Sequence, residues 1–254
     1  MSEHDIEFTR EDIDTYLKEL AKRFRKLNGT KMPGEIIIVG GAAVLLRYDF
    51  RKQSRDIDGI IRASSAIKES INYVADKYNL PRGWLNTDFV KTRSYSPALY
   101  AHSKYYKTYS NVLMVRIIEP EFLIAMKLVA SRNYKYDFSD IIGILKEQKK
   151  EEKPISFEII KNAVCELYGD YESVIPEESR RFLDEVYKSQ NLDELYDKYY
   201  KTAMSNKKNL IAFETQYPGT LNEDNLDEIM QNLQHQQELK QNDSYEFDND
   251  DIEL

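Results

Sequence analysis

The sequence lacks three features that would each point to a particular class of protein. Cysteine occurs once among 254 residues, at Cys165, which excludes an internal disulfide framework and a cysteine-rich zinc site. No apolar run approaches the roughly 20 residues that a membrane span needs, so we expect no membrane partner. The first ten residues lack the basic-then-apolar order of a signal peptide, and we therefore expect a cytoplasmic protein.

The chain also lacks an excess of positive charge, since 44 Asp and Glu outnumber 36 Lys and Arg and the formal net charge is −8. The deficit lies at the C-terminus, where residues 205–254 contain twelve Asp or Glu and three Lys. The preceding body is therefore close to neutral, and nucleic-acid binding stays open. The composition of residues 211–254 predicts a flexible acidic tail. Within it, four apolar residues at helical spacing predict a short helix near 222–234: Leu226, Ile229, Met230 and Leu233.

Hydrophobic periodicity divides the rest of the chain into two parts. In the first, helices are expected at 10–28, 42–46, 65–78 and 120–132, and strands at 35–39, 56–61 and 111–118. In the second, only helices are expected, at 140–148, 156–168, 177–188 and 192–204. The sequence thus predicts an α/β (α+β) protein. Its N-terminal lobe (1–140) has a small mixed sheet flanked by helices, followed by a helical C-terminal lobe (141–210) and the acidic tail (211–254).

Two carboxylates stand on one predicted strand. Asp56 and Asp58 occupy alternate positions, so both side chains point to the same side, with Cα atoms roughly 6.5 Å apart. The other residues of this strand are mostly apolar, and charges on a core-forming strand need a cation or a partner. Magnesium prefers oxygen ligands and shares its coordination shell with substrate phosphates. The spacing can serve one or two Mg²⁺ ions, and we expect Asp56 and Asp58 to bind two, for which Mn²⁺ can substitute.

Gly40 and Gly41 stand where a predicted strand turns into a helix. Glycines at such a junction let a triphosphate approach the backbone, and the helix start offers unpaired N–H groups. A tight turn that needs a positive φ explains the same glycines without any ligand. Ser54 and Arg55, just before the aspartate pair, can add a hydroxyl and a cation. We expect these four residues to bind the phosphates of an NTP.

Two stretches resemble known motifs. Ile37-Ile-Val-Gly-Gly41 and Ser54-Arg-Asp-Ile-Asp58 resemble the signature of the DNA polymerase beta nucleotidyltransferase superfamily. The stretch from Pro120 to Arg132, with the acids that follow it, is similar to a later motif of minimal nucleotidyltransferases that include the AbiE-type toxins of toxin-antitoxin systems. The resemblance covers about residues 35–145. It implies a metal-dependent enzyme that transfers a nucleotide from an NTP to an acceptor.

The resemblance to AbiE-type toxins also implies roles in the later motif. It implies that Lys127 helps to hold the nucleotide phosphates and that Asp140 is needed for activity. An exposed cation on an amphipathic helix would explain Lys127 equally, and helix capping would explain Asp137 and Asp140. The third carboxylate of polymerase-type sites stays open among Asp88, Asp137 and Asp140. A cognate antitoxin protein is the implied partner.

Segment 82–107 combines cations with aromatic rings. It contains five cations against Asp88 alone, and tryptophan and tyrosine rings lie among them: Arg82, Lys91, Arg93, Lys104 and Lys107, with Trp84, Tyr95, Tyr100, Tyr105 and Tyr106. Cations for phosphates and rings for bases are what single-stranded nucleic acid needs, although rings that pack on the core would also explain the pattern. We expect an RNA acceptor, first of all a tRNA 3′ end. The alternatives are a protein hydroxyl, a small molecule such as an aminoglycoside, or an inactive scaffold that binds nucleotide or a partner.

Overall fold

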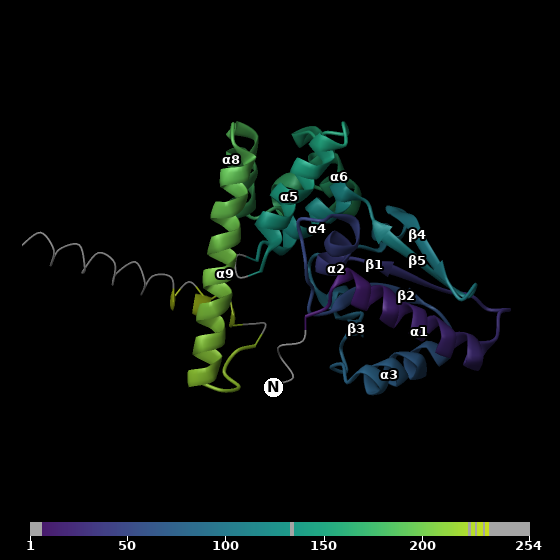
Figure 1. Ribbon diagram of the computed structural model, residues 1–254. Helices are drawn as coiled ribbons and strands as arrows, with labels where there is room; N and C mark the ends of the chain where they lie inside the picture. Colours follow the sequence, from purple (N-terminus) through teal and green to yellow (C-terminus); the bar gives the residue numbers. More distant parts are fainter. Residues whose placement is uncertain (1–6, 133–134, 223–224, 227, 231, 234–254) are drawn as a thin grey trace, which may run out of the picture. The chain divides into compact units, whose positions relative to one another are not determined.

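A computed structural model describes residues 7–132, 135–222, 225, 226, 228–230, 232 and 233 (Figure 1). These residues form two compact units. The first contains residues up to 131 together with 137–196, and the second contains residues 132–136 together with those from 197 onward.

The first unit is built around a five-stranded mixed sheet with the strand order β3-β2-β1-β5-β4. Its strands are β1 (Gly34–Ile38), β2 (Ile57–Arg62), β3 (Leu85–Asn86), β4 (Ser103–Tyr109) and β5 (Leu113–Ile118). Strand β1 pairs antiparallel with β2 and parallel with β5, while β3 runs parallel to β2 and β4 antiparallel to β5. The predicted small mixed sheet is confirmed, and β3 and β4 are additions to it.

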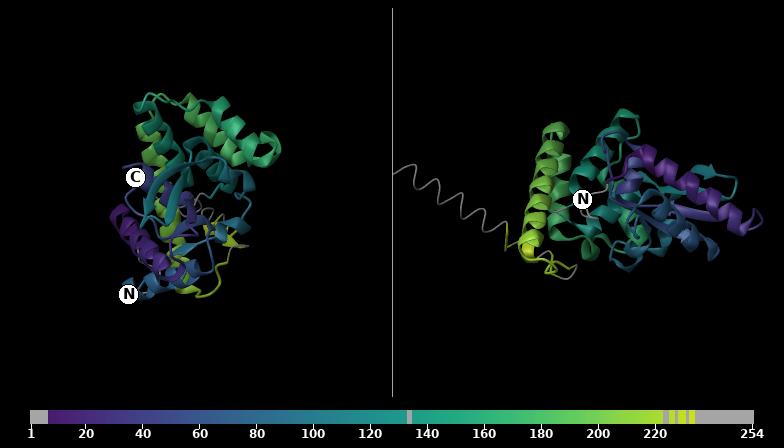
Figure 2. Two further views of the ribbon diagram at one scale, coloured as in Figure 1. Left: turned by 90° about the vertical axis from the view of Figure 1, so that its right-hand side faces the viewer. Right: turned by 60° about the horizontal axis from the view of Figure 1, so that its bottom comes forward.

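Helices surround and extend this sheet. They are α1 (Arg10–Asn28), α2 (Gly40–Arg47), α3 (Ala66–Tyr78), α4 (Pro120–Ala130), α5 (Asp137–Lys150), α6 (Phe157–Tyr168), α7 (Tyr171–Val174) and α8 (Glu177–Lys188), with the short 3₁₀ helices η1 (Asp88–Lys91) and η2 (Pro97–Tyr100). Helix α1 begins with a capping box, in which the Asp12 N–H donates to Thr9 Oγ1 (3.2 Å) and the Thr9 N–H donates to Asp12 Oδ2 (2.9 Å). Helices α1 and α3 pack against each other (Figure 2).

The two faces of the sheet differ in exposure. Gly34 and Ile38 point to the face that α1 covers, because Phe24 of α1 bounds the space beside Gly34. Residues paired across neighbouring strands share a face, so Gly59, opposite Ile38, also faces α1. Asp58 alternates with Gly59 and therefore lies on the other face. That face carries further strand residues that are half-buried or exposed: Ile60, Arg62, Met114 and Arg116.

Helix α4 lies at the centre of the helical part of this unit. It packs against α5 and α6, and residues 122–129 are all buried. The predicted helices beyond residue 140 are present, although α5 begins three residues earlier than expected, at Asp137. No helix within the ranges that the structure covers is long and apolar enough to cross a membrane.

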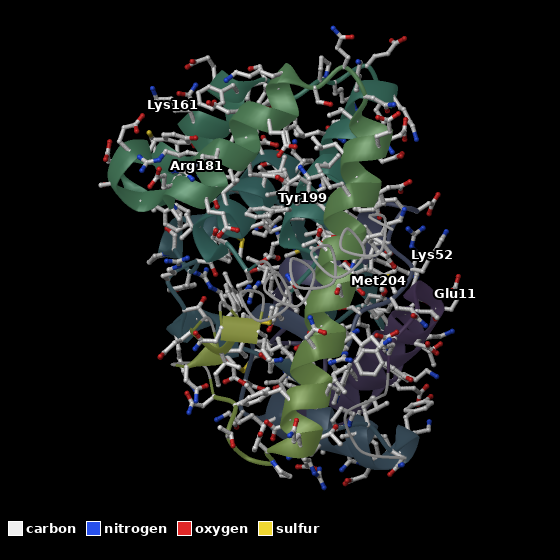
Figure 3. The ribbon with its side chains drawn as sticks, turned by 90° about the vertical axis from the view of Figure 1, so that its left-hand side faces the viewer. Glu11, Lys52, Lys161, Arg181, Tyr199 and Met204 are labelled. Atoms are coloured by element: carbon white, nitrogen blue, oxygen red, sulfur yellow. The ribbon has the colours of Figure 1, made fainter. Side chains whose placement is uncertain are left out.

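The second unit contains most of α9 (Leu192–Gln216), which extends beyond the predicted end at residue 204. The ring of Tyr136 stacks on that of Tyr200 with centroids 5.2 Å apart, and Met204 of α9 is 50% exposed (Figure 3). The described residues between 226 and 233 are helical, as the apolar spacing there predicts, and Met230 is buried. The predicted acidic tail beyond residue 233 lies outside the described residues.

Candidate functional site

The chain turns sharply between β1 and α2. Gly40 has a φ of +63°, a conformation that only glycine adopts without strain, so the predicted tight turn is confirmed at this position. A Cβ added to Gly40 would lie 3.3 Å from Asp58 Oδ2, and the Val39 N–H donates to the Asp58 carbonyl (2.9 Å). No side chain caps the start of α2. The turn therefore brings the first turn of α2 beside the Asp58 carboxylate.

Asp58 is half-buried on β2, and Asp56 is exposed immediately before that strand. The strand begins one residue later than predicted, so Asp58 is its second residue and Asp56 lies just outside it. Within the described ranges, no group of three or more His, Cys, Asp or Glu side chains is arranged to hold a metal ion. The Asp58 carboxylate beside the turn, with the exposed Asp56 two residues before it, nevertheless fits Mg²⁺, because that ion commonly takes one or two carboxylates and completes its shell with water and substrate phosphates.

Gly41 lies against the loop 48–56, which leads to β2. A Cβ on Gly41 would lie 2.7 Å from Arg51 Nη2 and 3.1 Å from Ser54 Oγ. Ser54 is buried, and its hydroxyl donates to the Asp56 carbonyl (3.1 Å). Its backbone forms a bridge with Phe8, through bonds of 2.6 and 3.0 Å. The absence of a side chain at Gly41 thus lets Arg51 and Ser54 approach the turn.

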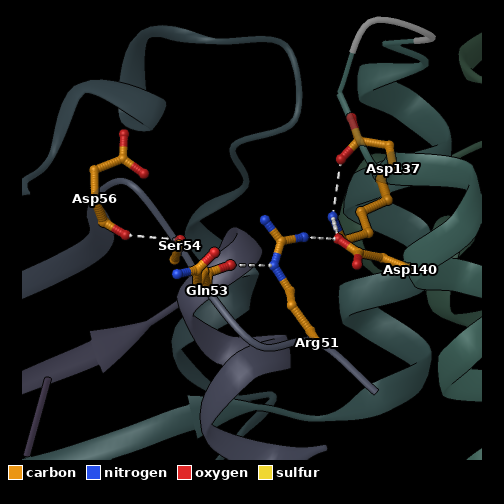
Figure 4. Close-up of polar contacts among 7 residues, drawn as sticks. Arg51, Gln53, Ser54, Asp56, Asp137 and Asp140 are labelled. Carbon is orange, nitrogen blue, oxygen red and sulfur yellow. Dashed lines mark hydrogen bonds and ion pairs between the residues drawn. The ribbon is translucent and has the colours of Figure 1, made fainter. Parts of the chain in front are cut away.

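Arg51 begins a chain of alternating charges that leads into the protein (Figure 4). Its Nε donates to the Gln53 carbonyl (3.1 Å), and its Nη1 donates to Asp140 Oδ2. Lys127 Nζ lies 2.8 Å from Asp140 Oδ2 and 2.8 Å from Asp137 Oδ1. We call Arg51, Asp140, Lys127 and Asp137 the buried charge chain. Each charge in it has a counter-charge, which is the condition under which ions are tolerated away from water.

The burial of this chain corrects one interpretation of the sequence. Lys127 is 4% exposed, so the reading of an exposed cation on an amphipathic helix is wrong. Asp137 and Asp140 are 2% and 3% exposed and pair with cations at the start of α5. Sequence reasoning assigned no role to Arg51, because its contact with Asp140 joins positions 89 residues apart. The one signal in the sequence that could have led to Arg51 was the pair of acids in the later motif, because buried carboxylates need a cation.

Two other candidates lie in different surroundings. Arg55, expected to bind phosphate, is exposed, and its Nε lies 3.8 Å from Glu7 Oε1. Asp88, a candidate for the third carboxylate, is exposed and lies 3.3 Å from Lys91 Nζ. The structure thus brings together Gly40, Gly41, Ser54, Asp58 and, through Arg51, the buried charge chain.

Segment 82–107 is partly core and partly surface. Trp84 is fully buried and its indole N–H donates to the Ile71 carbonyl (3.1 Å), whereas Tyr105 is 64% exposed. The guanidinium of Arg62 lies 3.5 Å from the centre of the Tyr100 ring. Four cations of the segment form ion pairs, which are Arg82–Asp76, Lys91–Asp88, Lys104–Glu119 and Lys107–Asp14. The rings therefore divide between core packing and an exposed surface.

Comparisons with known proteins place the chain in one family. A family described as nucleotidyltransferases of unknown function (DUF6036) matches residues 15–190, which is more than half of the chain. No curated protein and no solved structure matches the chain. The matched range contains the turn, Asp56, Asp58 and the whole buried charge chain. The chain therefore belongs to the DUF6036 family of nucleotidyltransferases.

Proposed function

We propose that this protein transfers a nucleotide from an NTP to an acceptor hydroxyl at the turn formed by Gly40 and Gly41. The observation that carries the proposal is the position of the Asp58 carboxylate, 3.3 Å from where a Cβ on Gly40 would lie. A carboxylate beside a helix start that no side chain caps is suited to a metal-bound phosphate, because the helix start attracts anions and the carboxylate attracts the cation. Membership of a nucleotidyltransferase family supports the same reaction class.

In this reaction the acceptor oxygen attacks the α-phosphorus of the NTP. The bond from that phosphorus to the oxygen bridging to the β-phosphate breaks, pyrophosphate leaves, and the hydroxyl proton is released to solvent. Magnesium held by Asp56 and Asp58 would offset the negative charge of the phosphates. The amides at the start of α2 bind phosphate oxygens, since the first N–H groups of a helix have no partner within it. Ser54 adds a hydroxyl beside these amides, since its Oγ lies 3.1 Å from where a Cβ on Gly41 would be.

As acceptor we propose an RNA 3′ end, first of all that of tRNA. The support comes from the exposed Tyr105 ring and the Arg62–Tyr100 stack, because rings and cations bind unpaired nucleotides. The ion pairs of segment 82–107 do not oppose this, since exposed pairs contribute only about 0–1 kcal/mol and can exchange for phosphate contacts. On the resemblance to AbiE-type toxins, we extend the proposal to a toxin that a cognate antitoxin holds in check.

Incubation with α-labelled NTPs tests the reaction and its acceptor together. The protein is mixed with Mg²⁺ or Mn²⁺, each NTP in turn and total tRNA, beside the double variant Asp56→Ala/Asp58→Ala. We expect label on the RNA with the wild type alone. Label on the protein or on an added aminoglycoside would replace RNA as the acceptor. If no NTP labels the RNA, the protein or the aminoglycoside, the protein would be interpreted as an inactive scaffold.

A side chain at Gly40 would have two effects, blocking of the turn and backbone strain, and a control variant separates them. Gly40→Ala and Gly29→Ala both force a positive φ on alanine, at +63° and +71°, but only Gly40 faces Asp58, since nothing lies within 4 Å of a Cβ on Gly29. We expect both variants to lose about 1–2 kcal/mol of unfolding free energy. Only Gly40→Ala should lose nucleotide transfer, by about tenfold or more, because its methyl group blocks the approach of phosphate to the turn. Equal transfer rates in the two variants would contradict a site at the turn.

A further inference from the structure

Arg51 lies where an arginine can contact the phosphates of a nucleotide at the turn. Its Nη2 is 2.7 Å from the position that a Cβ on Gly41 would take, and Ser54 Oγ borders the same position at 3.1 Å. The side chain is 17% exposed, at the outer end of the buried charge chain. A guanidinium carries five N–H donors in a planar fork, so it can hold a carboxylate along one edge and a phosphate along another.

Lys127 is in a different position. Its ammonium lies 2.8 Å from one carboxylate oxygen of Asp137 and 2.8 Å from one of Asp140, and its side chain is 5% exposed. An ammonium that moved to a phosphate would leave two buried carboxylates without it, and buried charges that lose their partner are costly. The contacts of Lys127 therefore suit a fixed counter-ion inside the protein.

We propose that Arg51 is the cation that binds the triphosphate at the Gly40–Gly41 turn, and that Asp140, itself held by Lys127, positions its guanidinium. The inference rests on the proposed function, because it assumes an NTP at this turn. It makes Arg51 a ligand-contacting residue, while Asp140 and Lys127 act through it. The chain of contacts links acids and a lysine of the later motif to a turn that lies far from them in sequence.

The test is equilibrium binding of each NTP with Mg²⁺, and of the corresponding nucleoside, to the purified full chain. Arg51→Gln is expected to weaken NTP binding by about 10- to 100-fold, the worth of a charge-assisted hydrogen bond or two, and to leave nucleoside binding unchanged. Arg51→Lys keeps the charge near Asp140 but loses the fork, so its NTP affinity should resemble that of Arg51→Gln. The matched control is Lys52→Gln, which removes an exposed cation from the same loop (Figure 3) and should change the affinity by less than about twofold.

The positioning role of Asp140 has its own readout. Asp140→Asn should weaken NTP binding less than Arg51→Gln does, and the double variant should bind no more weakly than Arg51→Gln, because Asp140 acts only through Arg51. Unchanged NTP affinity in Arg51→Gln, or an equal loss for NTP and nucleoside, would overturn the inference while the proposed function stands. A wild-type protein that binds none of the four NTPs would overturn the proposed function and this inference together.

Discussion

Replacing either aspartate of the pair, as Asp56→Asn or as Asp58→Asn, is expected to lower the rate of nucleotide transfer by about a thousandfold or more. A metal ion stabilises the charge of the transition state by several kcal/mol, and each 1.36 kcal/mol corresponds to about a factor of ten in rate. Asp56 is exposed, so its replacement should change the unfolding free energy by no more than about 0.5 kcal/mol. The loss of rate should therefore appear without a loss of fold.

The control for this result is the same substitution at an acid outside the site. Asp184→Asn removes an exposed carboxylate of α8 that pairs with Lys188 (3.4 Å), and transfer by this variant should match the wild type. Rates are compared at saturating Mg²⁺ and NTP, with unfolding curves recorded for each variant. Wild-type rates in both Asp56→Asn and Asp58→Asn would place the metal elsewhere.

The second large effect concerns stability. Lys127→Met is expected to lower the unfolding free energy by about 3–5 kcal/mol, because it removes the buried cation that lies 2.8 Å from both the Asp137 and the Asp140 carboxylates. Lys188→Met is the matched control, since Lys188 pairs with Asp184 on the surface of α8 (3.4 Å) and its side chain is 79% exposed. Such a pair contributes at most about 1 kcal/mol.

Urea unfolding of the two variants measures the difference. The double variant Lys127→Met/Asp137→Asn should be more stable than Lys127→Met, because one of the two carboxylates left without Lys127 is then neutral. If Lys127→Met and Lys188→Met lost equal unfolding free energy, water would have to reach the buried charge chain and solvate its charges. That result would contradict the burial of the chain in the structure.

The sequence predicted those parts of the site that depend on local chain geometry. The strand that carries Asp58 was expected at 56–61 and lies at Ile57–Arg62, and Gly40 needs its positive φ because a strand passes into a helix within two residues. Each of these predictions needed only neighbouring residues.

The parts that escaped prediction depend on contacts between distant segments. The burial of Lys127 escaped prediction, since a role in phosphate binding and an exposed position on an amphipathic helix both stayed open for it. Residues 122–129 of α4 are all buried, and their nearly continuous apolar run was the signal of that burial. Arg51 could not be matched to Asp140, because no spacing rule relates a loop to a helix start 89 residues later. In segment 82–107 the sequence shows the cations, but it does not show that several of them pair with acids outside the segment, which are Asp14, Asp76 and Glu119. The strand β4 escaped for a related reason: its exposed, polar edge position gives no apolar alternation.

The most direct test of nucleotidyl transfer compares NTP labelled at the α-phosphate with NTP labelled at the γ-phosphate. Both are incubated with the wild-type protein, Mg²⁺ and the acceptor found in the screen. A reaction at the Gly40–Gly41 turn of the kind proposed leaves the α-label on the acceptor and releases the γ-label as pyrophosphate. Transfer of the γ-label to the acceptor, with the α-label remaining in NDP, would instead identify a phosphotransferase and contradict the central claim.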